Sequence, residues 1–559
     1  MNTRCLLLSF LFLASAPWVG LSQVSFTKIT EVAIVNDWGN FTGHAWGDYD
    51  GDGWLDLFVS NYEDTMNVLY RNDGAGTFTK ITGGNPVADS GYHAGAAWGD
   101  FDNDGLLDLI VAAPGLGSPE VGSSSLYRQT SKATFSLMDG NVLTNETGRF
   151  IAPAWVDYDN DGWLDLFLTN PSRKNRLYHN NADGTFVKVT SGQIVEDLGR
   201  SVAAAWADYD NDGYPDLFVA NDSIGNPCFL YHNERNGTFT RVTTGPVATD
   251  RSISITAAWG DFDNNGFLDL FVTGDTNPKN RLYRNNGDGS FTKITSGPEL
   301  DNPVGTAAEG AVWGDYDNDG HLDLFISYYG GQNALFHNTG DGTFEQVQSG
   351  SVVDETAGPN FTCSWADYDN DGFLDLFVAR LADLPEPNLL YHNDRNNHHW
   401  LEVRCIGTVS NRSAIGAKVR AKSVIGGVPV WQLREINGGD GGASAASLVA
   451  HFGLAETTRV ETLRIEWPSG AVQEFQNVSA DQSLTMVEPP RLQALGRSPG
   501  GFRIELVGAV GFSYSVETSE DLLAWLPWTT VTNSSRTMTL FDRREGTSTA
   551  YYYRAVGRD

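Results

Sequence analysis

A short acidic motif recurs seven times along the 559-residue chain. Each copy has the form Trp-x-Asp-(Tyr/Phe)-Asp-x-(Asp/Asn)-Gly-x-x-Asp, and successive copies begin 51 to 57 residues apart. A period this regular indicates one structural unit that is repeated along the chain. The first aspartates of the copies are Asp48, Asp100, Asp157, Asp208, Asp261, Asp315 and Asp367.

Counted from this first Asp, each motif places acidic or amide side chains at positions 1, 3, 5 and 9 and a backbone carbonyl at position 7. Five or more hard oxygen ligands around one point suit Ca²⁺, and the glycine at position 6 permits the sharp turn of such a loop. The sequence therefore predicts up to seven structural calcium ions, one per motif. The predicted ligands are Asp48, Asp50, Asp52, Trp54 and Asp56; Asp100, Asp102, Asp104, Leu106 and Asp108; Asp157, Asp159, Asp161, Trp163 and Asp165; Asp208, Asp210, Asp212, Tyr214 and Asp216; Asp261, Asp263, Asn265, Phe267 and Asp269; Asp315, Asp317, Asp319, His321 and Asp323; and Asp367, Asp369, Asp371, Phe373 and Asp375.

Two other interpretations of the motif are weaker. An EF-hand needs a glutamate at position 12 and a following helix, but position 12 is apolar in every copy, as in Val59 and Ile326. Solvated Asp-Gly turns would not need the same acids at one register seven times. Two carboxylates about 4 Å apart repel by roughly 4 kcal/mol at an effective dielectric constant near 20, so the crowding favours a bound cation. Asn265 replaces one charged ligand, and the fifth loop is therefore predicted to bind calcium most weakly.

The segments around each motif are typical of four β-strands. A short apolar stretch ending in Trp precedes the loop, and a run such as Leu55–Val59, apolar on both faces, follows it. A third strand of the type Asn175–Asn180 and a fourth of the type Ser290–Ile294 complete the unit. Four antiparallel strands repeated radially predict an all-β, seven-bladed β-propeller. The last copy lacks its fourth strand, and Ser25–Thr30 matches the missing segment, so we expect the N-terminal strand to complete blade seven.

The first 22 residues have the layout of a secretory signal peptide. One base, Arg4, precedes the apolar run Cys5–Ala14, which is shorter than the roughly 20 residues of a membrane span. We therefore expect a secreted, extracellular or cell-surface protein, with the periplasm as an alternative. The formal net charge of −33 argues against nucleic acid and anionic lipid as partners. Cys228, Cys363 and Cys405 are far apart and form no disulfide framework or zinc spacing.

The repeats resemble the FG-GAP/VCBS-type propeller family, whose members bind Ca²⁺ in such loops. The segment that follows is similar to the ASPIC/UnbV domain through His398–Val403, Ser410–Arg412, Ile415–Ala417, His451–Leu454 and Trp467–Gly470. This combination is similar to the cartilage acidic protein family and to secreted bacterial proteins. The resemblance implies extracellular calcium binding and adhesion or matrix interaction, and it supplies no chemistry.

Four segments follow from this organisation. Residues 1–22 are the predicted signal peptide, residues 23–397 the propeller and residues 398–489 the ASPIC/UnbV-like domain. Residues 490–559 begin at the Pro489-Pro490 pair and alternate in polarity, so they are predicted to form a small β-sandwich-like module for display or binding.

Catalytic residues are difficult to assign. His179, His232, His337 and His392 share one register of the third strand, where other repeats carry arginine, which favours packing or hydrogen bonding. His44, His93 and His321 are expected to be incidental, and His399 and His451 to be structural. The Gly-rich stretch Asn437–Gly442 lies among strands and is predicted to be a turn.

The sequence thus favours a non-catalytic, calcium-stabilised binding or adhesion protein, monomeric, with an unknown extracellular protein or glycan as ligand. An exported propeller lyase or hydrolase acting on polysaccharide stays the alternative. The variable loops Asn61–Met66, Pro114–Ser124 and Leu381–Pro387 are the candidate ligand-binding segments, with Pro114–Ser124 the best single patch.

Overall fold

A computed structural model describes residues 24–63, 65–74, 76–114, 122–275, 279–303, 305–355, 357–382, 385–439, 442–543 and 551–558. The predicted signal peptide lies outside the described residues. Most of the candidate patch Pro114–Ser124 does so too, as do parts of Leu381–Pro387 and of the Gly-rich stretch. Among the described helices, none is long and apolar enough to cross a membrane.

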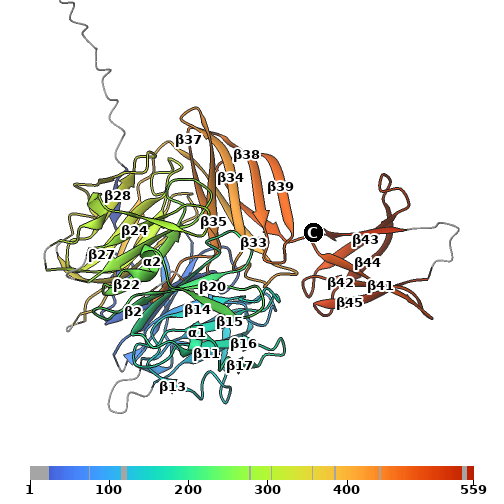
Figure 1. Ribbon diagram of the computed structural model, residues 1–559, viewed down its shortest axis with the longest axis horizontal. Coiled ribbons are helices and arrows are strands. Elements are labelled where there is room, and N and C mark those ends of the chain that lie inside the picture. Colours follow the sequence, from blue (N-terminus) through green and yellow to red (C-terminus); the bar gives the residue numbers. More distant parts are fainter. Residues whose placement is uncertain are drawn as a thin grey trace, which may run out of the picture.

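In chain order, the strands of the described propeller residues follow one another in antiparallel groups of four, which we call units. The last two groups are joined in one eight-stranded sheet, because the second strand of the sixth pairs with the first strand of the seventh. Figure 1 shows these strands packed around one another. In chain order the first six units are β2 (Phe41–Gly47), β3 (Asp56–Asn61), β5 (Val68–Asn72) and β6 (Phe78–Ile81); β8 (Ala96–Gly99), β9 (Asp108–Val111), β11 (Ser125–Ser131) and β12 (Thr134–Leu137); β14 (Pro153–Val156), β15 (Asp165–Leu168), β16 (Arg176–Asn180) and β17 (Phe186–Lys188); β18 (Ser201–Ala207), β19 (Asp216–Asn221), β20 (Phe229–Asn233) and β21 (Phe239–Val242); β22 (Ser254–Gly260), β23 (Asp269–Gly274), β24 (Arg281–Asn285) and β25 (Phe291–Ile294); and β26 (Ala307–Gly314), β27 (Asp323–Gly331), β28 (Ala334–Asn338) and β29 (Phe344–Gln346).

The seventh unit is completed from the other end of the chain. It consists of β30 (Gly358–Ala366), β31 (Asp375–Arg380), β32 (Leu389–Asn393) and the N-terminal strand β1 (Phe26–Lys28). Strand β1 pairs antiparallel with β32 in the register Phe26↔Asn393, which confirms the predicted closure by the N-terminal strand. The amide Nδ2 of Asn72 in unit one also donates to the carbonyl of Tyr368 in unit seven, at 2.7 Å. The all-β class is confirmed, and the count of seven blades stays a prediction in line with these contacts.

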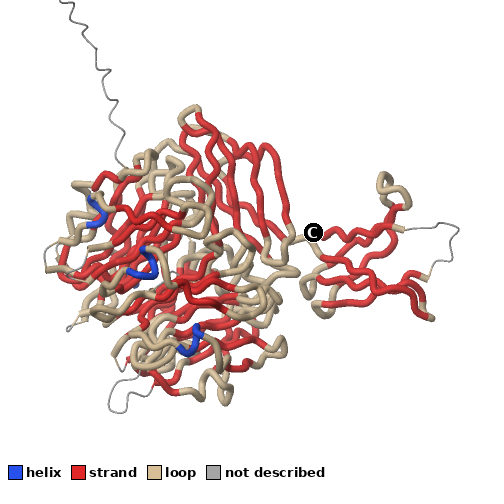
Figure 2. The backbone as a smooth tube through the Cα atoms, in the orientation of Figure 1, coloured by secondary structure: helices blue, strands red, loops and turns tan. Residues whose placement is uncertain are grey.

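Short elements occupy the connections. These are η1 (Ala33–Val35), β4 (Thr65–Met66), β7 (Ser90–Gly91), β10 (Gly122–Ser123), β13 (Thr147–Gly148), α1 (Gln193–Glu196), α2 (Pro246–Thr249) and η2 (Pro298–Leu300). Figure 2 shows how little of the chain is helical.

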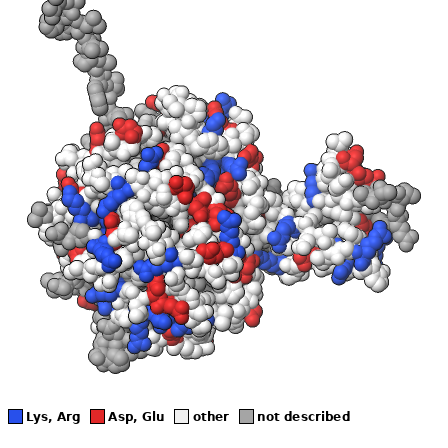
Figure 3. Space-filling model, viewed as in Figure 1, with Lys and Arg blue, Asp and Glu red and all other residues white. Residues whose placement is uncertain are grey.

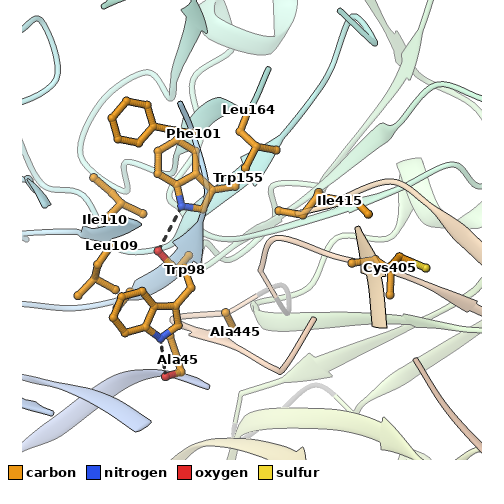
Figure 4. Packing of buried hydrophobic residues seen from close by; sticks show 14 of the residues in the cluster. Ala45, Trp98, Phe101, Leu109, Ile110, Trp155, Leu164, Cys405, Ile415 and Ala445 are labelled. Carbon is orange, nitrogen blue, oxygen red and sulfur yellow. Dashed lines mark hydrogen bonds between the residues drawn. The ribbon is translucent and has the colours of Figure 1, made fainter. Parts of the chain in front are cut away.

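In four of the seven motifs, the tryptophan donates its indole N–H to a backbone carbonyl of the preceding unit; these are Trp98, Trp155, Trp259 and Trp313. Trp98 donates its indole N–H to the carbonyl of Ala45 in the preceding unit at 3.1 Å, and Trp155 does the same to Ala97 at 3.2 Å (Figure 4). Gly47 lies against the ring of Trp98, where an added Cβ would be 2.8 Å from the ring. The Trp-Gly-Asp sequence is therefore a packing device as well as the entry to the acidic loop.

Residues 399–487 form a second body with two sheets. One sheet contains β37 (Val449–Ala455), β33 (His399–Ile406) and β40 (Gln482–Val487), and the other contains β35 (Val428–Glu435), β34 (Lys418–Ile425), β38 (Arg459–Glu466) and β39 (Val472–Ser479). We call this body the capping domain, because Figure 1 shows its orange strands against the propeller.

The segment between β35 and β37 leaves the capping domain and pairs with the inner strands of the propeller. Strand β36 (Ser444–Ala445) lies parallel to β2, and the carbonyl of Gly438 accepts the backbone N–H of Trp155 at 3.2 Å. A Cβ at Gly438 would be 2.2 Å from the carbonyl oxygen of Trp155. The prediction of a turn within this domain is therefore wrong for the described residues of Asn437–Gly442, because the glycines allow close approach to another part of the chain.

The C-terminal residues form two three-stranded sheets. These are β41 (Arg491–Ser498), β42 (Gly501–Val507) and β45 (Thr537–Asp542), and β43 (Ser513–Ser519), β44 (Leu526–Thr532) and β46 (Tyr552–Arg558). Ile504, Leu506, Tyr514 and Val516 form the buried centre between them. The predicted sandwich-like module is confirmed as part of the all-β fold.

Candidate metal centre

Each acidic loop joins the first strand of a unit to the second and is folded by its own side chains. In the first loop, Asp48 accepts the backbone N–H of Asp52 at 3.0 Å and that of Gly53 at 3.2 Å. The side chain of Asp52 accepts the N–H of Trp54 at 2.9 Å. At position 7 the structure thus assigns a role to the N–H, while the role of the carbonyl as a ligand stays a prediction.

The aspartate at position 9 anchors the loop to the sheet. Asp56 accepts the N–H of Tyr49 at 3.1 Å and that of Asn72, in the third strand, at 2.8 Å. The corresponding acids are all buried, from Asp108 in unit two to Asp375 in unit seven. This structural role could not be derived from the spacing of the motif alone.

Asparagines at position 4 connect one loop to the next. Six of them adopt left-handed backbone conformations with φ between 55° and 59°, and Gly51 takes this position in loop one with φ 69°. The side chain of each asparagine donates to the carbonyl of the position-6 glycine in the following unit, as in Asn318 to Gly372 at 3.0 Å. The last one, Asn370, donates to Gly53 in unit one at 3.0 Å. The donors are Asn103, Asn160, Asn211, Asn264, Asn318 and Asn370.

The carboxylates of a loop converge closely enough to hold a metal ion. Ligand atoms of Asp48, Asp50 and Asp52 lie within 4.8 Å of one another. Burial raises the pKa of Asp56 to about 8. Burial, followed by the charges of neighbouring carboxylates, also raises the pKa of Asp100 well above its usual range. Such groups carry an electrostatic cost that a bound cation would remove.

Orphaned oxygen atoms support the same conclusion. Asp157 Oδ1, Asp216 Oδ2 and Asp369 Oδ1 are buried and have no hydrogen-bond partner. Buried polar atoms normally have a partner, and an all-oxygen donor set suits a hard cation such as Ca²⁺. The residues present therefore fit the predicted group.

In six units the His or Arg at this register of the third strand pairs with the acidic loop of its own unit, whereas Arg71 in unit one pairs with Asp73 at 2.6 Å. The imidazole of His392 lies 3.1 Å from Asp369 Oδ2, and the guanidinium of Arg284 lies 2.5 Å from Asp263 Oδ2. Hydrogen bonding to Asp165 raises the pKa of His179 to about 9. These side chains form ion pairs with the position-3 carboxylate or its neighbours, in line with the hydrogen-bonding role predicted for this register.

Residues beyond 398 contact every one of the seven loops, which the sequence did not indicate. Figure 3 shows acidic and basic side chains next to each other where the capping domain meets the propeller. The loops are contacted in turn by Arg404 on Asp48 (3.1 Å), Arg412 N–H on Asn103 (2.7 Å), Arg536 on the carbonyl of Gly162 (2.6 Å), Lys418 on Asp208 (2.6 Å), Arg420 on the carbonyl of Gly266 (3.2 Å), Gly453 N–H on Asp315 (3.1 Å) and His451 on the carbonyl of Gly372 (3.1 Å).

The remaining histidines hold parts of the fold together. His44 is fully buried and lies 2.7 Å from Ser364 Oγ across the boundary between units one and seven. His451 contacts loop seven, and His399 lies 2.7 Å from Asp481 within the capping domain. His93 is buried 3.8 Å from Asp89. His321 lies 3.2 Å from the side chain of Asn264.

A second repeated device escaped the sequence analysis. A carboxylate in the connection before a unit accepts the hydroxyl of that unit's third-strand tyrosine and pairs with a base of the fourth strand. Asp250, for example, is 2.7 Å from Tyr283 Oη and 2.5 Å from Lys293 Nζ. The tyrosine in the Leu-Tyr-(His/Arg)-Asn strand was visible in the sequence, but its acidic partner lies in connections of variable length.

Comparisons with known proteins agree with this architecture. The model for the FG-GAP-like repeat matches residues 48–111, 157–219, 208–272, 261–326 and 315–378, and the ASPIC and UnbV model matches residues 407–492. Cartilage acidic protein 1 from Homo sapiens is 29% identical over 287 residues, and the match covers 49% of this chain and 41% of that protein. The Mus musculus protein of the same name is 29% identical over 290 residues, covering 49% and 42%.

Among solved structures, an Agrocybe aegerita lectin that recognises non-reducing terminal N-acetylglucosamine is similar with a TM-score of 0.42. It is 17% identical, and the likeness covers 60% of this chain and 88% of the lectin. A likeness at this level says nothing about ligands of this protein.

Proposed function

Because the chain belongs to the family in which FG-GAP-like repeats are followed by an ASPIC and UnbV domain, we propose that it is an extracellular, calcium-stabilised binding protein without catalytic activity. The proposal has three parts, namely metal binding in the loops, ligand binding elsewhere on the propeller, and a location outside the cell. The location is supported by the leader-like residues 1–22 and by the kinship with cartilage acidic protein 1.

The metal part is supported by carboxylates that converge in each loop and are buried at positions 1 and 9. When bound, Ca²⁺ would neutralise two of the negative charges in each loop and hold its oxygens at one point. The chain itself fixes the loop conformation through the N–H donors at positions 5, 6 and 7 and through the left-handed residue at position 4. We expect Asp48, Asp50, Asp52 and Asp56, and their equivalents, to hold the ion.

The proposal that the protein is not catalytic is supported by the residues that lie over the acidic loops. All seven loops contact residues beyond 398, and the first acid of every loop is buried. The carboxylates at positions 1 and 9 are buried and are therefore not open to a polysaccharide substrate, whereas position-5 acids such as Asp52 are exposed. The loop acids are therefore structural in this proposal.

A ligand would then meet the propeller on its opposite side. Because antiparallel strands alternate in direction, the links between second and third strands and the connections between units lie away from the acidic loops. Strand β4 in one such link pairs with β7 in a unit connection, with Thr65↔Gly91. Met66, in β4, is 58% exposed, and Trp38 is 71% exposed. Loops over a rigid scaffold are where binding residues usually lie.

Two experiments test the proposal on the full chain. Native mass spectrometry with added Ca²⁺ should show up to seven bound ions, and melting should occur at higher temperature in millimolar Ca²⁺ than in chelator. Each site occupied at 10 to 100 times its dissociation constant should add roughly 1–3 kcal/mol. Absence of bound calcium together with an unchanged melting temperature would remove the metal part.

A glycan array and a pulldown with calcium present test the binding part. A ligand should be retained by the purified chain and left unmodified. Turnover of a polysaccharide that is lost in His93→Ala would instead favour the exported lyase or hydrolase, since this histidine lies outside the metal loops.

A further inference from the structure

One carboxylate in the connection before unit three is shared by three side chains of that unit. Glu146 Oε1 accepts Arg176 Nε at 2.5 Å and Lys188 Nζ at 2.6 Å. Glu146 Oε2 accepts the hydroxyl of Tyr178 at 2.8 Å. The side chain of Arg176 is only 12% exposed, so this glutamate supplies the opposite charge that a buried guanidinium needs.

Unit five has the same arrangement with a shorter acid. Asp250 Oδ2 accepts the hydroxyl of Tyr283 at 2.7 Å and Lys293 Nζ at 2.5 Å. Arg281 stands at the register of Arg176, two residues before the tyrosine of its strand. Among the residues that the structure describes, no carboxylate forms an ion pair with Arg281. An aspartate is one methylene shorter than a glutamate, and this difference accounts for the missing pair.

Arg281 is therefore a buried cation without a counter-charge. Its exposed fraction is 4%. Its Nη2 donates to the hydroxyl of Ser254 at 2.7 Å and to the carbonyl of Thr273 at 3.2 Å, whereas its buried Nε has no partner in the described part of the chain. Burying a charge is costly unless that charge is paired and hydrogen-bonded. An anion bound at this guanidinium would supply the missing charge.

A cavity of about 730 Å³ lies beside Arg281. Sites for small ligands have volumes of roughly 300–1,000 Å³, so this one is large enough. Ser252, Thr295 and Ser296 contribute to its lining, whereas the buried Glu299 of the same connection does not. The cavity lies at the end of the propeller opposite the acidic loops, because it is formed where β24 begins and where β25 ends.

The cavity is locally basic although the chain carries a net charge of −33. Lys279 and Lys293 line it together with Arg281, and their partners are Asp301 and Asp250. Three bases against two acids leave one positive charge, which is that of Arg281. At physiological ionic strength, exposed charges more than about 8 Å apart are largely screened. The nearby groups therefore decide which ligand is attracted.

The lining favours an acidic sugar over an acidic segment of a protein. Protein interfaces usually centre on buried aromatic anchors, and the apolar residues given for this cavity are all aliphatic. Hydroxyl and cationic side chains instead suit a ligand that offers both hydroxyl groups and an oxyanion, such as a uronate or a sulfated sugar.

We propose that this cavity binds the oxyanion group of an acidic polysaccharide, with Arg281 as the side chain that pairs with the carboxylate or sulfate. The inference rests on the proposed binding function, and it adds the place on the propeller and the class of ligand. The short side chain of Asp250 leaves Arg281 available for this role. Unit three cannot form an equivalent site, because Glu146 already neutralises Arg176.

The decisive variant is Asp250→Glu, which installs the acid of unit three and keeps Arg281. Binding to the full chain is measured by calorimetry with calcium present, using three probes. These are an oligogalacturonate, whose anions are carboxylates, a carrageenan oligosaccharide, whose anions are sulfates, and a neutral maltooligosaccharide. The wild type should bind an acidic probe and not the neutral one, and the acidic probe that binds identifies the oxyanion. Asp250→Glu and Arg281→Met should each weaken this binding at least tenfold, as expected for the loss of a charge-assisted hydrogen bond.

Melting temperatures separate this role from a structural one. Asp250→Glu should melt at a higher temperature than the wild type, because the buried guanidinium gains a partner. Arg281→Met should melt no lower than the wild type, because it removes an unpaired charge. Arg176→Met is the matched control: it leaves Glu146 without its guanidinium, so it should melt at a lower temperature and keep the affinity for the acidic probe.

Three results would overturn the inference. The first is a wild-type chain that binds neither acidic probe, or that binds a poly-aspartate peptide in their place. The second is an acidic probe bound equally by the wild type and Arg281→Met. The third is weakened binding in Asp250→Glu together with a lower melting temperature. The proposed binding function would survive each of them if the glycan array or the pulldown retained another ligand, and it would fall only if neither retained any.

Discussion

The buried ion pair between Lys418 and Asp208 offers a quantitative test of how the capping domain is held. Lys418 opens strand β34, and its Nζ lies 2.6 Å from Asp208 Oδ2 and 2.6 Å from Asn211 Oδ1. The side chains of the pair are each 6% exposed. The perturbation is Lys418→Met, which keeps the apolar stem and removes the charge.

The expected loss follows from the charges that stay behind. Removing one partner of a buried pair leaves an uncompensated charge and costs about 3–5 kcal/mol. Asp208 would stay buried beside Glu435, whose pKa burial already raises to about 8. We therefore expect a loss of about 3–5 kcal/mol in chelator. In saturating Ca²⁺ the loss should be about half as large, because the metal in loop four also neutralises Asp208.

The measurement is urea unfolding of the full chain followed by tryptophan fluorescence, in chelator and in calcium. Lys422→Met on the same strand is the matched control, since Lys422 and its partner Glu461 are 32% and 41% exposed. Exposed pairs contribute about 0–1 kcal/mol. A loss below about 1 kcal/mol for Lys418→Met in chelator, or equal losses in the two conditions, would refute this account of the interface.

Three further predictions concern individual contacts. Asn318→Gly should destabilise the chain by about 1–2 kcal/mol, because its hydrogen bond to the carbonyl of Gly372 is buried. Asn160→Gly should cost no more than about 0.5 kcal/mol, because its hydrogen bond to the carbonyl of Gly213 is exposed. Equal shifts of the melting temperature in the two variants would contradict this. Burial lowers the pKa of His44 to about 3, so below about pH 6.5 the unfolded chain binds a proton that the folded chain does not bind, and the free energy of unfolding falls. Between pH 7 and pH 5, urea unfolding of His44→Asn should therefore show a fall in the free energy of unfolding that is about 2 kcal/mol smaller than in the wild type. The same pH dependence in both proteins would contradict this prediction. Gly372→Ala should loosen the capping domain, because the added Cβ would overlap the ring of Trp400. Amide hydrogen exchange in β33 should therefore become faster. Gly342→Ala is the control: Gly342 has a similar φ of 86° but open space around it, so this variant should leave the amides of β33 protected.

Much of the propeller could be predicted because its signals are local and repeated. The apolar runs after each loop, such as Leu268–Val272, are long enough to identify a buried strand, and the pairing of Phe26 with Asn393 follows from matching one repeat to another. The acids at positions 1, 3, 5 and 9 come from a single short segment, so their convergence depends on one turn. Gly53 at φ 93° provides that turn, as its residue type indicated.

The contacts between distant segments could not be predicted in the same way. Nothing in the alternation of β33 shows that Arg404 meets Asp48, which is 356 residues away. The glycines of Asn437–Gly442 looked like a turn, because a sequence shows that glycine allows close approach but does not show what approaches. The acid of the tyrosine pairs, such as Asp250, is similarly hidden in a connection with no fixed spacing.

The sequence by itself determined the repeated unit, the order of its strands and the chemistry of its loops. These properties depend on residue type and on spacing within about a dozen positions, where the covalent chain limits the possible geometries. Only the tertiary structure decided that the acidic loops share one side of the propeller and that the capping domain covers them. That outcome depends on packing and charge pairing between segments hundreds of residues apart, such as Lys418 with Asp208, which no local pattern encodes. The sequence therefore predicts the loops as metal sites, and only the fold shows that they also form an interface with the C-terminal part of the chain.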